Sequence, residues 1–181
     1  MNVYDFDKTI YPADSTASFY GFCLRHYPRT WLTLPCTVWA FFALGTHLLP
    51  KTRAKELFFR FLRHTPPEAP DRFWAAHRDR FCPWYLAQRR PEDLIIYASP
   101  AFLIATAAAY LGISFLASPV DRRTGRYSGR NCDGAEKLRR YRAVWGDTPV
   151  EGFWSDSRSD HHMAEFAEKA WLVRRGIPEP W

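Results

Sequence analysis

The chain begins with a short apolar run that ends in two carboxylates, Asp5 and Asp7, spaced two residues apart. Side chains at positions i and i+2 of a strand point to the same side. The carboxyl ends of parallel strands are also where open α/β sheets bind their ligands. Two close carboxylates repel one another unless a cation or a shared proton lies between them. The pair alone fits either Mg²⁺-dependent phosphoryl chemistry or a strand that runs into an acidic turn.

Short apolar runs and helical segments alternate along the second half of the chain. The runs that predict strands are 2–6, 94–98, 113–117, 150–154 and 171–173. The segments that predict helices between them are 101–111, 135–144 and 162–170. This alternation predicts an α/β fold built on a doubly wound parallel sheet.

Polar residues lie at the ends of these strands or the starts of these helices, in a recognisable order. They are Ser99, Lys137, Asp156 and Asp160. Each of them alone fits an ordinary turn, helix-terminal or solvated side chain. Together with D-F-D-K-T at residues 5–9, the set resembles the four motifs of the haloacid dehalogenase superfamily, and in particular its phosphoserine-phosphatase-like subgroup.

The resemblance implies a Rossmann-like core and a reaction that passes through a phosphoaspartate. By motif position, Asp5 is expected to be the nucleophile. Asp7 is expected to be the general acid that protonates the leaving oxygen and then activates water. The implied cofactor is Mg²⁺, bound by the Asp5 carboxylate, the Asp7 backbone carbonyl and Asp156.

The other motif residues are expected to bind phosphate or to support the residues that do. The Ser99 hydroxyl is expected to bind a phosphate oxygen, and Lys137 to stabilise the charge of the transition state. Asp160 is expected to hold Lys137 or a metal-bound water. Lys8 stands where many relatives have Gly. This departure leaves both aspartates of the motif in place, so we expect the chemistry to be intact.

The interval between the first two motifs is far longer than a strand crossover needs. It is rich in Trp, Phe, Leu and Arg and poor in strand signals, which indicates an inserted helical cap. We therefore predict a catalytic α/β core of residues 1–14 and 89–181 and a cap of residues 15–88. The helices predicted within the cap are 16–26, 31–48, 52–63 and 71–88.

Charge and cysteine content limit the partners and the compartment. The formal net charge of +6 suggests an anionic partner, either a phosphate substrate, an acidic membrane surface or nucleic acid. We do not expect nucleic acid, because the acidic motifs point to phosphate chemistry. The four cysteines form no C-x-x-C pair, and the polar N-terminus lacks a secretory signal. These features predict a cytoplasmic protein with reduced thiols.

Residues 31–50 carry no formal charge and approach the length of a membrane span. A single span would place Asp5 on the opposite side of the bilayer from Ser99 and Lys137, which must meet the same substrate. Two interpretations remain open. The segment either lies at the surface of an anionic membrane, where its tryptophans and flanking cations fit, or packs as the apolar core of the cap.

The preferred functional hypothesis is therefore a Mg²⁺-dependent phosphomonoesterase that forms an aspartyl-phosphate on Asp5. Its substrate is expected to be a lipid phosphate such as phosphatidylglycerophosphate, since the cap loosely resembles that of bacterial phosphatidylglycerophosphatases. One alternative is a phosphatase of a small soluble metabolite similar to phosphoserine. Another is a non-catalytic module that binds membrane or nucleic acid, although such a module has no need of Asp7.

Overall fold

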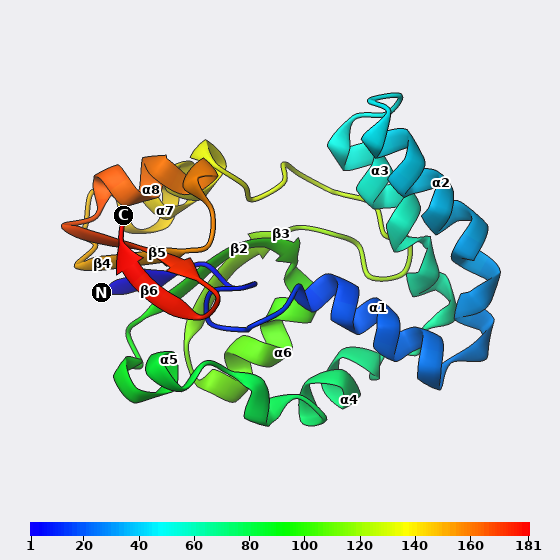
Figure 1. Ribbon diagram of the computed structural model, residues 1–181, viewed down its shortest axis with the longest axis horizontal. Helices are drawn as coiled ribbons and strands as arrows, with labels where there is room; N and C mark the ends of the chain where they lie inside the picture. The colour runs from blue at the N-terminus through cyan, green and yellow to red at the C-terminus, as the bar shows by residue number, and fades with distance from the viewer.

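The computed structural model describes residues 1–181 as a six-stranded sheet with helices on both faces (Figure 1). The strand order is β3-β2-β1-β4-β5-β6, with β1 to β5 paired in parallel and β6 antiparallel to β5. The strands are β1 (Asn2–Tyr4), β2 (Leu94–Pro100), β3 (Ser114–Ser118), β4 (Gly152–Ser155), β5 (Lys169–Arg174) and β6 (Ile177–Pro180). The predicted doubly wound α/β fold is confirmed.

Successive side chains of the central strands point to opposite faces of the sheet, so the hydrophobic core has a part on each face. Tyr4 and Trp154 pack on the face covered by α4, α5 and α6, whereas Val3 and Phe153 pack on the face covered by α7 and α8 (Figure 1). These helices are α4 (Ala69–Ala75), α5 (Pro83–Gln88), α6 (Ala101–Leu111), α7 (Ala135–Trp145) and α8 (His161–Phe166). A sheet buried on both faces explains why its central strands read as continuous apolar runs.

The C-terminal edge of the sheet differs from the prediction. The predicted helix 162–170 is too long, because α8 ends at Phe166 and β5 begins at Lys169. A further strand, β6, was not predicted, and it returns along β5 through a tight turn. Arg175 and Gly176 form this turn with φ values of 51° and 79°, as a two-residue hairpin requires. β6 contains two prolines, which an edge strand tolerates because it has no further neighbour to bond.

Between β1 and β2 the chain forms only helices. The longer ones are α1 (Ser15–His26), α2 (Leu34–Gly45) and α3 (Lys51–Phe58), and 3₁₀ helices separate several of them. The predicted helix 16–26 is confirmed as α1. The predicted helices 31–48, 52–63 and 71–88 are each interrupted, and α2, α4 and α5 have a proline in the first turn, where a new helix begins readily. No helix is both long enough and apolar enough to cross a membrane.

Some helices of residues 15–88 pack against the sheet, and others lie away from it. Helices α1, α4 and α5 join the large apolar cluster under the sheet, where Phe19 and Phe73 pack with Phe6 and Leu103. Helices α2 and α3 lie at the far edge of the molecule, away from β4, β5 and β6 (Figure 1). The loop after β3 ties α3 to the core: Tyr127 donates its backbone N–H to Glu56 Oε1 at 3.1 Å. The division into core and cap stays a prediction.

Candidate active site

Asp5 and Asp7 lie where β1 leaves the sheet at its carboxyl edge. Asp5 extends the strand by one residue, since its N–H donates to the Trp154 carbonyl at 2.8 Å. The chain then turns sharply through Lys8, whose φ is 55°. A side chain is strained in this left-handed region, where glycine fits without cost. Both aspartates are buried, with 2% and 4% of their surfaces exposed.

Lys137 bridges two of the predicted site residues. It projects from the first turn of α7, and its ammonium donates both to Asp5 Oδ1 and to Asp160 Oδ2. The contact with Asp160 measures 2.6 Å. Asp160 also accepts a hydrogen bond of 2.7 Å from the Ser155 hydroxyl at the end of β4. The geometry therefore brings Asp5, Lys137 and Asp160 together, with Asp160 orienting the lysine.

The ionisation of Asp5 depends on its cation. Burial raises the pKa of the Asp5 carboxyl, Lys137 lowers it, and the carboxylates of Asp160 and Asp156 raise it further. Burial alone would lower the pKa of Lys137, but the contacts with Asp5 and Asp160 outweigh burial and raise it. Lys137 is thus a firmly charged ammonium. Asp5 needs this charge, and benefits from any further cation, to remain an ionised nucleophile.

Asp7 is held by a tyrosine that the sequence analysis did not identify. The Tyr97 hydroxyl, on β2, donates to Asp7 Oδ2 at 2.5 Å. The other carboxylate oxygen, Oδ1, is buried and has no hydrogen-bond partner. Burial raises the pKa of Asp7 to about 7, with Asp14 adding to the rise. A carboxyl with this pKa exchanges protons readily near neutral pH, as a general acid and base must.

We expect Tyr97→Phe to lower kcat roughly tenfold, because Asp7, the predicted general acid, would lose its fixed orientation and transfer protons less efficiently. The hydrogen bond from Tyr97 favours the Asp7 carboxylate and so lowers its pKa. Its loss raises the pKa, and the protonated acid then persists to higher pH. In the pH profile of kcat/KM, the alkaline limb should therefore shift to higher pH. Tyr110→Phe, on an exposed tyrosine of α6, is the matched control, and identical profiles for both variants would contradict this role.

Ser99 lies on β2, two residues beyond Tyr97 and at the same edge of the sheet as Asp5. The pairing of β2 with β3 shifts register between Tyr97 and Pro100, and such irregularities commonly re-aim a side chain beside a functional site. The Ser99 hydroxyl shares a hydrogen bond of 2.8 Å with the Thr16 hydroxyl of α1. The predicted phosphate ligand is therefore close to the first motif and is positioned by an unpredicted threonine.

Asp156 follows β4 and completes the acidic cluster. Its carboxyl is partly buried, and burial raises its pKa while Lys8 and Lys137 lower it. Asp5 and Asp160 share one buried cation, Lys137, and Asp156 also interacts with Lys8, so the three carboxylates outnumber the two cations. Hard carboxylate oxygens with excess negative charge fit a divalent cation such as Mg²⁺. No group of three or more His, Cys, Asp or Glu side chains is arranged to hold a metal, whereas the predicted set needs only two carboxylates and a backbone carbonyl.

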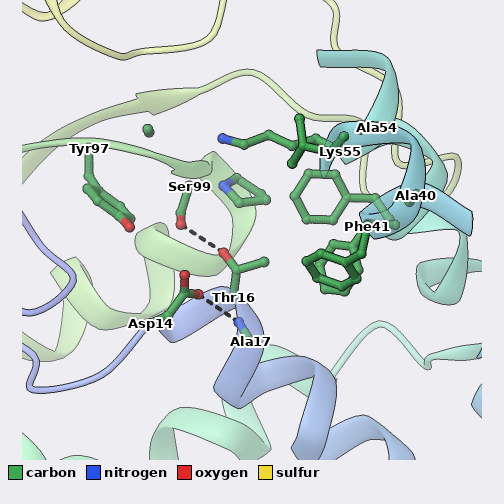
Figure 2. A pocket seen from close by; sticks show the side chains of 14 residues that line it. Asp14, Thr16, Ala17, Ala40, Phe41, Ala54, Lys55, Tyr97 and Ser99 are labelled. Carbon is green, nitrogen blue, oxygen red and sulfur yellow. Dashed lines mark hydrogen bonds between the residues drawn. The ribbon is translucent and has the colours of Figure 1, made fainter. Parts of the chain in front are cut away.

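A cavity of about 210 Å³ opens beside these residues, between the sheet edge and helices α2 and α3. Figure 2 shows Asp14, Thr16, Tyr97 and Ser99 at its polar end, with the amino group of Lys55 pointing toward them from α3. The opposite end is apolar and is lined by Ala40, Phe41, Leu44, Ala54, Phe58 and Phe59. Tyr97 joins the cavity to the first motif, because it lines the cavity and its hydroxyl contacts Asp7.

Thr16, Lys55 and Tyr97 belong to this site but were not predicted from the sequence. A signal existed for Tyr97, because it lies two positions before Ser99 on the same strand, and this spacing predicts a shared face. Thr16 follows the first motif, and nothing in the sequence paired it with Ser99. Lys55 lies far from every motif in the sequence. Burial lowers its pKa, as does Lys51, and its placement depends on how α3 packs.

Comparison with known proteins supports the fold and identifies the family. The sequence model of the haloacid dehalogenase-like hydrolases matches residues 3–165. A search of curated proteins finds no match. Among solved structures, a protein of unknown function from Bordetella pertussis Tohama I is 19% identical with a TM-score of 0.72, covering 95% of this chain and 88% of its own.

Two further solved structures share the fold at lower similarity. A phosphoserine phosphohydrolase-like protein from Francisella tularensis is 15% identical with a TM-score of 0.60, covering 95% of this chain and 87% of its own. A phospho-aspartyl intermediate analogue of phosphoserine phosphatase is 13% identical with a TM-score of 0.56, covering 94% of this chain and 84% of its own.

The family match spans nearly the whole chain and includes every residue of the acidic cluster. The chain therefore belongs to the haloacid dehalogenase-like hydrolases, and the predicted superfamily is confirmed. The roles of the individual residues remain predictions.

Proposed function

We propose that this hydrolase is a Mg²⁺-dependent phosphomonoesterase that forms an aspartyl-phosphate on Asp5. The observation that carries the proposal is the buried contact of Lys137 with both Asp5 and Asp160 at the carboxyl edge of the sheet. An ion cluster of this kind is costly to bury, so an arrangement made only for folding would gain little from it. Phosphoryl transfer requires such a preorganised cluster, because positioning and charge stabilisation supply nearly all of its catalysis.

The proposed reaction has two steps that return the enzyme to its starting state. In the first, an Asp5 carboxylate oxygen attacks phosphorus, the bond from phosphorus to the leaving oxygen breaks, and Asp7 gives that oxygen its proton. In the second, Asp7 takes a proton from water, which attacks the phosphorus of the aspartyl-phosphate. The bond between phosphorus and the Asp5 oxygen then breaks, releasing orthophosphate and restoring both carboxyl groups.

Lys137, Asp156 and Ser99 would stabilise the charge that develops during these steps. Lys137 lies against Asp5 and would face the phosphoryl oxygens as they approach it. Asp5, Asp156 and the Asp7 backbone carbonyl would hold Mg²⁺, which when bound supplies positive charge to the transferring phosphoryl group. The Ser99 hydroxyl would exchange its hydrogen bond with Thr16 for one to a phosphate oxygen.

The preferred substrate is a lipid phosphate monoester, for which phosphatidylglycerophosphate is one example. Support comes from the cavity beside Ser99, whose polar end would receive the phosphate and whose far end is apolar. Lys55 is the cation of that cavity and would contact the phosphate or another anionic group of the substrate. An acyl chain can be buried among phenylalanine and alanine side chains without leaving any polar group unsatisfied. A small polar metabolite would gain no binding free energy from these apolar side chains.

A soluble metabolite similar to phosphoserine is the second candidate. It is favoured by Asp14 and Lys55, which give the polar end of the cavity one group of each charge. These groups match the ammonium and carboxylate of an amino acid. A binding module without catalysis is a weaker alternative, because it would have no use for the buried Asp7.

Hydrolysis of p-nitrophenyl phosphate with Mg²⁺, and again after chelation, tests the reaction class. We expect turnover that chelation removes, and a wild-type protein with no metal-dependent turnover would disprove the proposal. Monomeric alkyl phosphates of increasing chain length then test the substrate class. The lipid hypothesis predicts that kcat/KM rises with chain length, whereas preference for phosphoserine over every alkyl phosphate would favour the soluble metabolite.

A further inference from the structure

Helix α2 is inverted relative to an ordinary amphipathic helix. Its buried side chains are small or polar, namely Thr37, Ala40 and Ala43. Its large apolar side chains face outward, with Val38 65% and Phe42 54% exposed. A helix of a globular protein normally presents the opposite arrangement, with its large apolar residues turned toward the core. The pattern therefore requires a partner on the outer side of α2.

Exposed large apolar side chains lie along α2 and past both of its ends, which gives this region an apolar surface. We call it the α2 face, and it consists of Trp31, Leu32, Val38, Trp39, Phe41, Phe42, Leu44 and Leu48. These are eight of the twelve large hydrophobic residues that the whole chain exposes. Such concentration differs from the scattered single apolar residues of most protein surfaces and marks an interaction site. In Figure 1, α2 occupies the edge of the molecule opposite β4, β5 and β6.

The charge around the α2 face identifies an anionic partner. Residues 15–64 contain seven Lys and Arg residues and a single acidic residue, Glu56. Their net charge of +6 equals that of the whole chain, so the rest of the protein is neutral overall. Arg25 and Arg29 are exposed before α2. Lys51 and Arg53 are exposed after it, where they also pair with Asp133 and Glu56.

Further arginines lie beside the same helices. Arg60 reaches Cys36 of α2, with 3.6 Å between its guanidinium and the Cys36 Sγ. Arg53, Arg60, Arg63 and Arg126 also line a cavity of about 310 Å³ next to α3. Cations that flank an apolar, tryptophan-bearing helix are the combination that binds the interface of an anionic bilayer.

A second copy of the chain is a poorer partner for this face. A symmetric dimer would bring two α2 faces together, and each would carry the same surplus of positive charge. That charge would repel across the interface, whereas anionic headgroups would neutralise it. The face is also continuous with the cavity beside Ser99, because Phe41 and Leu44 belong to both. A chain drawn from a bilayer could thus follow α2 into the cavity.

We propose that the α2 face docks the protein onto an anionic lipid bilayer, with α2 lying in the plane of the interface and its Trp and Phe side chains inserted. The evidence for docking is the exposed apolar residues of the α2 face and the positive charge around them. Its link to catalysis rests on the proposed phosphatase function, since docking would place the apolar end of the cavity at the surface that supplies lipid phosphates.

Flotation with vesicles tests the docking directly. The wild-type protein should float with vesicles of phosphatidylcholine and phosphatidylglycerol, and much less with phosphatidylcholine alone or in high salt. The double variant Trp39→Ser, Phe42→Ser should bind the anionic vesicles at least about tenfold more weakly, because two inserted aromatic side chains are lost. Val144→Ser, Ile177→Ser is the matched control, since it removes two exposed apolar side chains elsewhere, and it should bind like wild type.

Three outcomes would overturn the proposal. The first is a wild-type protein that does not float, and the second is equal vesicle binding by the two double variants. The third is a wild-type protein that binds no vesicles but forms a dimer in sedimentation, which the Trp39→Ser, Phe42→Ser variant no longer forms. The assay with p-nitrophenyl phosphate separates this result from the proposed function. We expect the variant that loses binding to keep wild-type turnover of this soluble substrate. Vesicle binding by a protein without metal-dependent turnover would refute the phosphatase and leave the docking intact.

Discussion

Asp5→Asn will remove phosphatase activity while leaving the protein folded and at least as stable as wild type. We expect turnover of p-nitrophenyl phosphate to fall by more than about 10³-fold, because the variant has no carboxylate to form the covalent intermediate. Stability should hold or rise, since burial and two neighbouring carboxylates raise the pKa of Asp5 and make its charge unfavourable. Groups that are tuned for catalysis often destabilise the fold in this way.

Steady-state kinetics and thermal unfolding of the same preparations test both parts of this prediction. Asp147→Asn is the matched control, because Asp147 is an exposed carboxylate far from the cluster, and it should retain wild-type turnover and stability. An Asp5→Asn protein that retains more than about a tenth of the activity would exclude Asp5 as the nucleophile. A large fall in its melting temperature would instead assign Asp5 a structural role.

Lys137→Met is expected to have the largest effect on stability. The side chain of Lys137 is only 3% exposed and is the shared partner of Asp5 and Asp160. Methionine leaves two buried carboxylates without their cation, and removing one partner of a buried ion pair costs about 3–5 kcal/mol. The free energy of unfolding from denaturant titration should fall by that amount in the absence of metal, and turnover should be lost.

A second substitution shows whether the loss comes from unpaired charge. Adding Asp5→Asn to Lys137→Met removes one of the stranded carboxylates, so the double variant should recover part of the lost stability. Lys169→Met, on an exposed lysine at the start of β5, is the control and should change stability by less than about 0.5 kcal/mol. Equal stability of the single and double variants would mean that Lys137 acts through packing and not through its charge.

The sheet was predictable because its strands are short, apolar and separated by helices. The residues of β1, β2 and β4 are buried on both faces, so they produce continuous apolar runs that composition alone reveals. β6 gave no such signal, because its two prolines argue against a strand and only a position at the free edge accommodates them. The end of α8 was also hidden, since Lys169 and Ala170 suit a helix but are paired with β4.

The outward face of α2 shows a limit of reasoning from hydrophobicity. The apolar composition of residues 31–50 was visible, and it fitted either a membrane surface or the core of a cap. Only the packing shows that small residues such as Ala40 and Ala43 face inward while Trp39 and Phe42 face solvent. Sequence periodicity could not decide this, because apolar residues cover every side of the helix.

The candidate site likewise contains residues that were predictable from the sequence and contacts that were not. Asp5, Lys137 and Asp160 were expected to meet because each follows a strand or opens a helix at one edge of the sheet, and the topology brings them together. Of the supporting contacts, only that of Tyr97 left a signal in the sequence. The hydrogen bond of Thr16 with Ser99 depends on the packing of α1 against the strand ends. The hydrogen bond of Tyr97 to Asp7 depends on the pairing of β1 with β2.

Trapping the covalent intermediate tests the central claim most directly. The protein would be mixed with a phosphomonoester and Mg²⁺, quenched in acid within the first turnover, digested and analysed by mass spectrometry. We predict one phosphoryl group on the peptide that contains Asp5, removable by hydroxylamine as an acyl phosphate is, and absent from Asp5→Asn. Release of orthophosphate by a protein whose Asp5 peptide never carries the group would contradict the account.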